Sequence, residues 1–87
     1  MSIKRKYQCP CCGFYTLDGS SGTVGICPVC YWEDDNIQFA DPDYKGGANG
    51  ISLNKARSDY KRIGAIFEQY LHSVRLPLEE EMPENNR

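Results

Sequence analysis

Four cysteines arranged as two Cys-x-x-Cys pairs are the residues whose types and spacing could do chemistry in this chain. The pairs are Cys9/Cys12 and Cys27/Cys30, and a glycine- and serine-rich segment separates them. Four soft thiolate ligands in two such pairs are typical of a zinc ribbon, in which each pair supplies two corners of a tetrahedral site. We therefore predict that these four residues bind one structural zinc ion.

The residues around each pair favour the tight turn that lets both thiols face one ion. Proline follows the first cysteine of each pair, at Pro10 and Pro28, and its fixed φ suits the first corner of a turn. Gly13 follows the first pair and can adopt positive φ, so that backbone amides point at the sulfurs. Tyr31 stands at the equivalent position after the second pair, which makes the second turn less favourable by sequence.

The same four thiols allow a second metal. Two pairs of this kind also hold one iron ion in rubredoxin-like electron carriers, so iron is the alternative cofactor. We favour zinc because iron would need a redox partner, to which no feature of the sequence points. Disulfides would need an oxidising compartment. The amino terminus lacks the apolar segment of a signal peptide, and we therefore expect a reducing, cytoplasmic location.

A fifth cysteine, Cys11, lies between the two ligands of the first pair. One interpretation is a small filler residue that points away from the ion. The other is a thiol that the nearby cation acidifies and makes available for exchange. The sequence leaves both interpretations open.

The ligands must be positioned by short elements on either side of them. Residues 14–17 and 23–26 are expected to form two strands, and residues 18–22 the turn between them. The connector at 41–50 is rich in glycine and turn residues, and we expect it to be an ordered loop lying over the ribbon.

An amphipathic helix is predicted after that connector. Ser52 is its expected N-cap, and Gly64 is expected to end or bend it. The apolar residues recur at helical spacing and should dock on the ribbon; they are Leu53, Ala56, Tyr60, Ile63 and Phe67. Residues 66–74 are apolar enough for a second helix or a continuation of the first.

A tryptophan and three acidic residues follow the second pair. We expect Trp32 to cover the apolar flank of the ion, with the alternative that it anchors a partner. Glu33, Asp34 and Asp35 are typical of a solvated acidic loop, and with Trp32 they are the candidates for binding another protein. No catalytic residue is assigned, and we expect no enzyme, because four cysteine ligands leave no open position on the metal.

Composition bounds the remaining choices. The 87 residues suit one small domain, predicted at 1–78, followed by an acidic disordered tail at 79–87. The formal net charge of −2 argues against a nucleic-acid or ribosome-associated ribbon, which stays an alternative because residues 4–6 and the predicted helix are basic. No stretch is long and apolar enough to span a membrane, so the expected partner is another protein.

Three separated blocks of this chain resemble the small bacterial CPCC cysteine-rich family. They are CPCCGFYTL at 9–17, CPVCYWEDD at 27–35 and PDYKGGANGISLNKAR at 42–57. The resemblance implies a small metal-bound α+β fold: a zinc ribbon with rubredoxin-like knuckles and a short antiparallel hairpin, then a loop and one or two packed helices. It implies no substrate. The leading hypothesis is therefore a metal-stabilised protein–protein interaction module.

Overall fold

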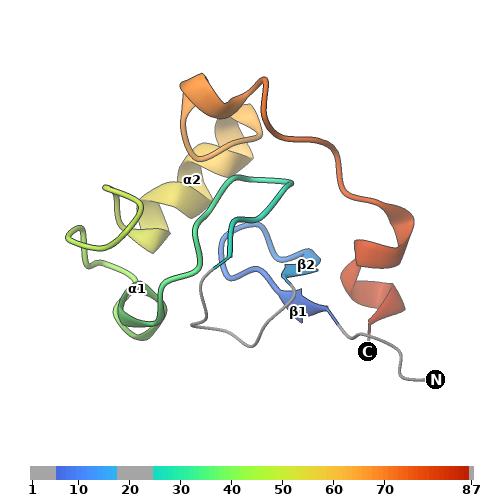
Figure 1. Cartoon of the computed structure of the whole chain (residues 1–87), viewed down its shortest axis with the longest axis horizontal. Helices are drawn as coiled ribbons and strands as arrows, with labels where there is room; N and C mark the ends of the chain where they lie inside the picture. The colour runs from blue at the N-terminus through green and yellow to red at the C-terminus, as the bar shows by residue number, and fades with distance from the viewer. Residues whose placement is uncertain (1–5, 18–24, 87) are drawn as a thin grey trace.

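The computed structural model describes residues 6–17 and 25–86 of the chain (Figure 1). It has a small α+β fold in which each cysteine pair forms a tight turn. We call residues 9–14 the first knuckle and residues 27–32 the second knuckle. Strands β1 (Tyr7–Gln8) and β2 (Tyr15–Leu17) flank the first knuckle as an antiparallel pair, with Tyr7 opposite Leu17.

The strand pairing differs from the expected one. Residues 15–17 form a strand as predicted, but their partner is β1 rather than residues 23–26. The predicted turn at 18–22 and most of the predicted second strand lie outside the described residues. Ile26 instead forms an isolated bridge with Glu33 across the second knuckle. Each knuckle closes its own short loop, and short loops cost the least entropy to close.

A short helix that the sequence pattern did not reveal follows the second knuckle. Helix α1 (Asn36–Ala40) begins at Asp35, whose carboxylate accepts from the N–H groups of Ile37 and Gln38. Gln38 is buried and donates to the carbonyl oxygens of Tyr44 and Ile51 at 2.8 and 2.7 Å. These two bonds order the loop after α1, because they join its first half to its end.

The predicted amphipathic helix is confirmed as α2 (Leu53–Ile63). The Ser52 hydroxyl accepts from the N–H of Lys55 at 3.1 Å, which caps the first turn. Gly64 ends the helix in the left-handed conformation, with φ of 89°. Leu53 and Ala56 are fully buried and dock the helix on the knuckles.

A second long helix at 66–74 does not form; this part holds one 3₁₀ turn, η1 (Glu68–Tyr70). Both ends of this part of the chain bond the backbone of the second knuckle. The N–H of Ile66 donates to the carbonyl oxygen of Cys30, and the N–H of Arg75 donates to that of Pro28, both at 3.0 Å. The segment between them therefore wraps over the knuckle.

Residues 79–86, which were expected to belong to a disordered tail, are folded. They contain the 3₁₀ turns η2 (Glu79–Glu81) and η3 (Pro83–Asn85), and η2 contacts β2. The buried carboxylate of Glu81 accepts two bonds of 2.8 Å from the Arg75 guanidinium. Acidic composition suggested solvation, but the Glu81 carboxylate has a bidentate partner in the arginine six residues before it. The domain boundary at residue 78 stays a prediction.

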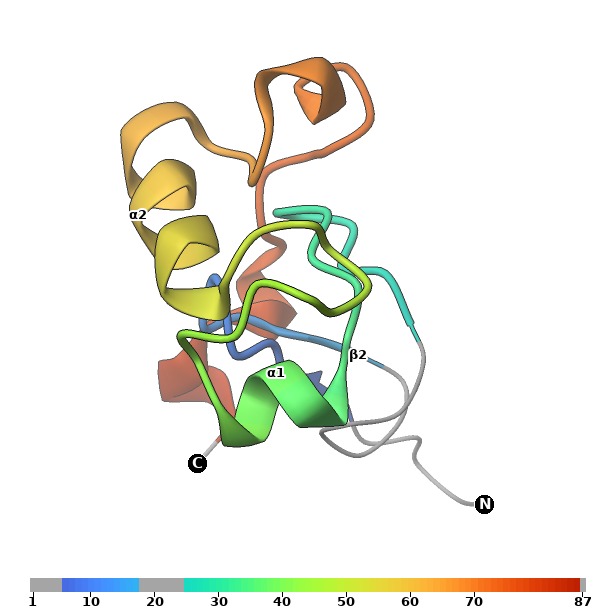
Figure 2. The same cartoon turned by 90° about the vertical axis from the view of Figure 1, so that its left-hand side faces the viewer.

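The core surrounds the cysteine cluster, and helices α1 and α2 lie to one side of the knuckles while the carboxyl-terminal turns lie on the other (Figures 1 and 2). Its most deeply buried side chains are those of Cys9, Leu17, Cys27, Val29, Cys30, Trp32, Leu53, Ala56 and Ile66. Within residues 6–17 and 25–86, no helix has the length and apolar character needed to cross a membrane.

Candidate metal centre

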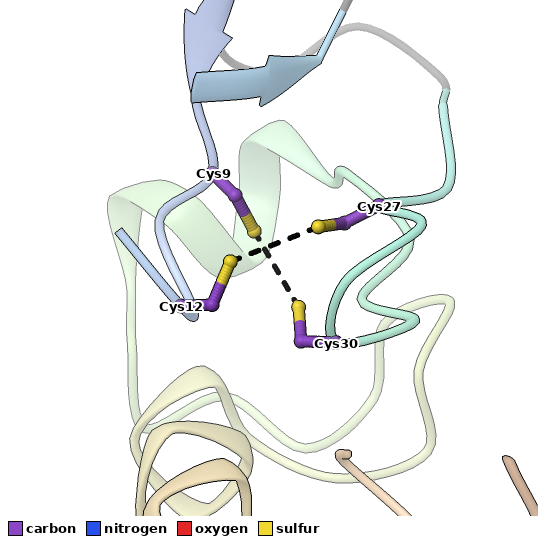
Figure 3. Close-up of side chains that lie close together, drawn as sticks. All are labelled: Cys9, Cys12, Cys27 and Cys30. Carbon is purple, nitrogen blue, oxygen red and sulfur yellow. Dashed lines mark hydrogen bonds between the residues drawn. The ribbon is translucent and has the colours of Figure 1, made fainter. Parts of the chain in front are cut away.

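The four paired cysteines meet between the two knuckles. Their sulfur atoms all lie within 4.8 Å of one another. The Sγ atoms of Cys9 and Cys30 are 3.6 Å apart, and those of Cys12 and Cys27 are 3.7 Å apart, so the two contacts cross the site from one knuckle to the other (Figure 3). All four cysteines are free thiols, since a disulfide would need about 2.05 Å between sulfurs.

These distances fit a tetrahedral metal ion. Four thiolates at about 2.3 Å from one ion lie about 3.8 Å from each other along the edges of the tetrahedron. The two crossing contacts of 3.6 and 3.7 Å are close to that value. Three of the cysteines are fully buried, and Cys12 is half-buried. The four cysteines could therefore hold one metal ion in a nearly closed site.

The backbone of the two knuckles is nearly the same. In the first knuckle the N–H of Cys9 donates to the carbonyl oxygen of Phe14, and the N–H of Gly13 donates back to that of Cys9, both at 2.9 Å. In the second, the N–H of Cys27 donates to Trp32 at 2.9 Å, and that of Tyr31 donates to Cys27 at 2.8 Å. The spacing of the cysteines and the proline between them thus produce the same turn twice.

Tyr31 takes the conformation that glycine takes in the first knuckle. Its φ is 74°, and that of Gly13 is 85°. A tyrosine in this left-handed region is strained by about 1 kcal/mol or more. The Tyr31 ring stacks on Tyr70 with the ring centroids 4.1 Å apart, and Phe67 meets Tyr70 edge to face. Aromatic contacts of this kind contribute about 0.5–1.5 kcal/mol and offset the strain.

Hydrogen bonds to the sulfurs come from both the backbone and one side chain. The N–H groups of Val29 and Trp32 donate to Cys27 and Cys30 at 3.4 Å. The buried Thr16 hydroxyl lies 3.0 Å from the Cys27 sulfur and can donate to it once that sulfur is a thiolate. Thr16 was missed from the sequence, where its place in a predicted strand gave no sign of a contact with the distant second pair.

The crowded thiols share protons. The hydrogen bond between Cys12 and Cys27 lowers the pKa of Cys27 and raises the pKa of Cys12. Burial, followed by the charge of the cluster cysteines, raises the pKa of Tyr60 to about 12. A divalent cation favours the thiolate form of every ligand, so binding it would release the protons that the cluster retains.

The residues predicted to contact a partner lie largely inside the structure. Trp32 is 0% exposed, which places its indole in the core rather than on a binding surface. Asp34 is buried, and its N–H donates to the carbonyl oxygen of Gly25. Asp35 accepts from the N–H of Ala48 at 3.0 Å with its second oxygen, and that bond lowers its pKa below the usual range. Among the four candidates, Glu33 and Asp35 remain half-exposed.

The acidic block and the glycine-rich block bind each other. The Asn49 side chain accepts from the N–H of Glu33 and donates to its carbonyl oxygen, both at 2.8 Å. Gly47 lies so close to Gln38 that a Cβ there would be 2.5 Å from the Gln38 side chain. The blocks at 27–35 and 42–57, which are separate in the sequence, thus form one structural unit behind the second knuckle.

Comparison with known proteins agrees with the cysteine geometry. The family model described as Cysteine-rich CPCC matches residues 7–81, a range that includes both knuckles, α2 and the Arg75–Glu81 ion pair. No curated protein matches the chain significantly.

Proposed function

The chain belongs to the cysteine-rich CPCC family, and on that premise we propose that it is a zinc-binding protein whose ion is structural and whose surface binds another protein. The observation that carries the proposal is the cluster of four cysteine sulfurs within 4.8 Å. Cys9, Cys12, Cys27 and Cys30 would hold the ion. Zinc supplies no redox chemistry and accepts a tetrahedral set of thiolates.

A structural role follows from the number of ligands. Four protein ligands complete the coordination of zinc and leave no position for a water nucleophile, and we therefore propose no enzymatic activity. The core around the cluster is small, and domains of this size commonly need a metal or a disulfide for stability. Structural zinc contributes about 10–16 kcal/mol of apparent binding free energy in small zinc peptides. A reducing cytoplasm would keep the thiols free for the metal.

The interaction role is supported by side chains that the fold leaves on the surface. Ile37 and Phe39 of α1 are 60% and 48% exposed, although both are large and apolar. Because residues two apart on a helix face different sides, these two do not share one surface. Phe39 is the one that lies beside the first knuckle, together with Arg57, and there it suits a binding surface. Because the ion would hold both knuckles, it would keep that surface in place.

Metal analysis of untagged protein tests the proposal. Cells are supplied with both zinc and iron, and the purified chain is examined for metal content and visible absorbance. We expect one zinc per chain and no colour. Addition of a strong chelator should move the Trp32 fluorescence to longer wavelength, since the buried indole becomes solvated when the knuckles separate.

The matched control compares two adjacent cysteines. Cys12→Ser should lose the zinc, whereas Cys11→Ser should retain it. One iron with thiolate charge-transfer bands would replace the zinc proposal with an electron carrier, whose potential the N–H and O–H bonds to the sulfurs would tune. A metal-free chain with unchanged fluorescence in chelator would contradict a structural ion altogether.

A further inference from the structure

A shallow cleft lies beside the first knuckle, on the side of the molecule where α1 and α2 approach it. Its volume is about 380 Å³. Residues from β1, the first knuckle and both α-helices line it, among them Gln8, Pro10, Cys11, Phe39 and Arg57. The cleft thus combines a rigid wall, which the metal ligands hold, with side chains of three chemical kinds: an amide, an aromatic ring and a cation.

Arg57 is the cation of the cleft, and it is held in place without a carboxylate. Its Nε donates to the carbonyl oxygen of Pro10 at 2.8 Å, and its Nη1 donates to the Asn54 side chain at 3.0 Å. Both acceptors are neutral, and no carboxylate lines the cleft. The negative charge nearest in the lining is that of the metal-ligating thiolates of Cys9 and Cys12, which the ion would partly neutralise. A guanidinium has five N–H groups, and these two bonds leave others for a ligand.

The other arginines that the structure describes differ in this respect. Arg62 pairs with Asp59 at 3.4 Å, and Arg75 pairs with Glu81 at 2.8 Å. In the described part of the chain, no carboxylate pairs with Arg57. Among the arginines that the structure describes, the one in the cleft is therefore the one that pairs with no carboxylate, in a chain whose net charge is negative.

The neutral side chains of the cleft complement that charge. Phe39 is 48% exposed and offers an apolar face. The Gln8 amide nitrogen donates to the carbonyl oxygen of Gly13 at 3.0 Å, which fixes the amide and leaves its oxygen as an acceptor. A peptide backbone N–H could donate to that oxygen while a neighbouring side chain covers the ring.

We propose that this cleft docks an acidic peptide segment of a partner protein, with a carboxylate of the segment on Arg57 and an adjacent apolar side chain on Phe39. The inference rests on the proposed function, of which it names the surface and the partner chemistry. One arginine matches one carboxylate in bidentate geometry. Phosphate-rich nucleic acid is the poorer match, because it would need several cations along the cleft, and Arg57 is the one cation among the residues that line it.

The test is titration of the full, zinc-loaded chain into fluorescein-labelled EEFEE peptide at low salt, followed by fluorescence anisotropy. Two control peptides separate the contributions: QQFQQ lacks the carboxylates, and EEAEE lacks the ring. We expect saturable binding of EEFEE, about tenfold weaker binding of QQFQQ and a smaller loss for EEAEE.

Variants locate the site on the protein. Arg57→Gln should weaken EEFEE binding about tenfold, whereas Arg62→Gln, which removes the same charge from the same helix, should change it less than about twofold. Arg57 also ties α2 to the knuckle, so metal content and Trp32 fluorescence are measured for each variant. Phe39→Ala provides a second test, since that exposed ring can be removed without opening the core; it should weaken EEFEE binding several-fold.

Several results would overturn the proposal. They are an absence of saturable EEFEE binding by intact zinc-loaded protein, equal losses in Arg57→Gln and Arg62→Gln, and tighter binding of a single-stranded oligonucleotide than of EEFEE. Sedimentation that reveals self-association lost in Arg57→Gln would assign the cleft to a second copy instead of a partner. Metal analysis is independent of these outcomes, so a failed docking site and a failed zinc assignment can be told apart.

Discussion

The two knuckles have nearly the same backbone but very different surroundings. Both close through the same pair of hydrogen bonds, and each contributes two sulfurs to the cluster. Around the first knuckle, the Pro10 carbonyl oxygen accepts from the Arg57 side chain, and a cleft remains open. Around the second, the Pro28 carbonyl oxygen accepts from the Arg75 backbone, and residues 65–75 lie over the turn.

This difference teaches that the spacing of the cysteines determines the backbone of each turn. The segments of the chain that pack on a turn determine whether it is enclosed or accessible. The second knuckle is enclosed by the wrapping segment and by the loop that Gln38 and Asn49 hold. It is therefore suited to stability. The first knuckle keeps an accessible face next to an arginine that pairs with no carboxylate in the described part of the chain, and this is the face that we propose for recognition.

Position by position, the comparison also bears on the two interpretations of the fifth cysteine. Cys11 stands in the first knuckle where Val29 stands in the second, one residue before the second ligand. Both side chains are buried, at 8% and 1% exposure. An apolar valine at the equivalent place shows that the turn accepts a buried side chain without a reactive group. The Cys11 thiol, however, is hydrogen-bonded to Cys30 and does not point away from the cluster, and that bond raises the pKa of Cys30. Both interpretations stay predictions.

The largest expected effect comes from removing one ligand from either knuckle. Cys9→Ser and Cys27→Ser should each abolish metal binding and expose Trp32, because both knuckles share a single ion. Metal content and tryptophan fluorescence measure the two effects together. If one variant loses its metal and the other keeps it, the knuckles do not contribute equally and the shared-site argument is wrong.

A smaller loss is expected when the wrap over the second knuckle is loosened. Glu81→Gln should reduce the free energy of unfolding by about 1.5 kcal/mol at neutral pH, since it removes the charge of a buried carboxylate from its ion pair with the exposed Arg75 guanidinium. The pair with Arg75 lowers the pKa of Glu81 below its usual value of 4.5. Its stabilising contribution is therefore present above about pH 4.5 and is lost as the pH falls through the lowered pKa.

Denaturant unfolding of both proteins as a function of pH measures that contribution. The gap between wild type and Glu81→Gln should close as the medium becomes acid. Because acid also protonates the cysteine ligands in both proteins, the comparison uses the difference between them and not either curve alone. A gap that is independent of pH would contradict the ion-pair explanation.

Removal of the hydrogen bond between Thr16 of β2 and Cys27 of the second knuckle should have the next largest effect. Thr16→Val keeps the shape of the side chain and removes the O–H that faces Cys27 at 3.0 Å. Zinc affinity should fall about tenfold, as is typical when a hydrogen bond to a metal ligand is lost. Competition with a chromophoric chelator measures it, and Thr16→Ser, which retains the hydroxyl, should recover most of the affinity.

The strain at Tyr31 is expected to be worth about 1 kcal/mol, and two substitutions separate it from the stacking. Tyr31→Ala loses the contact with Tyr70 and keeps the left-handed strain; Tyr31→Gly loses the contact and relieves the strain. Tyr31→Gly should therefore be the more stable of the two in thermal unfolding. At the equivalent position of the first knuckle, Gly13→Ala should destabilise by a similar amount. Equal stabilities of the two Tyr31 variants would show that the turn is not strained.

The smallest effect is expected at the fifth cysteine. Cys11→Val copies the second knuckle into the first and should change stability by less than about 1 kcal/mol, with one zinc retained. Metal content and thermal unfolding check this. Loss of the ion in Cys11→Val would instead support a chemical role for the thiol and break the equivalence of the two knuckles.

The sequence by itself determined the features whose causes are local. Cysteine spacing and the prolines at 10 and 28 were enough to predict the two turns and the four-thiol cluster. A serine cap, an apolar stripe at helical spacing and a glycine were enough to predict α2 and its end. Each of these signals acts within a few residues along the chain.

Only the tertiary structure decided the features that depend on partners far apart in sequence. It brought the Asn49 side chain to the backbone of Glu33, the N–H of Ala48 to the carboxylate of Asp35 and the Thr16 hydroxyl to the Cys27 sulfur. Polar and acidic residues look solvated in a sequence, because their hydrogen-bond partners cannot be read from composition. Burial of such groups becomes favourable only where the fold supplies those partners, and that requires the whole chain to be in place.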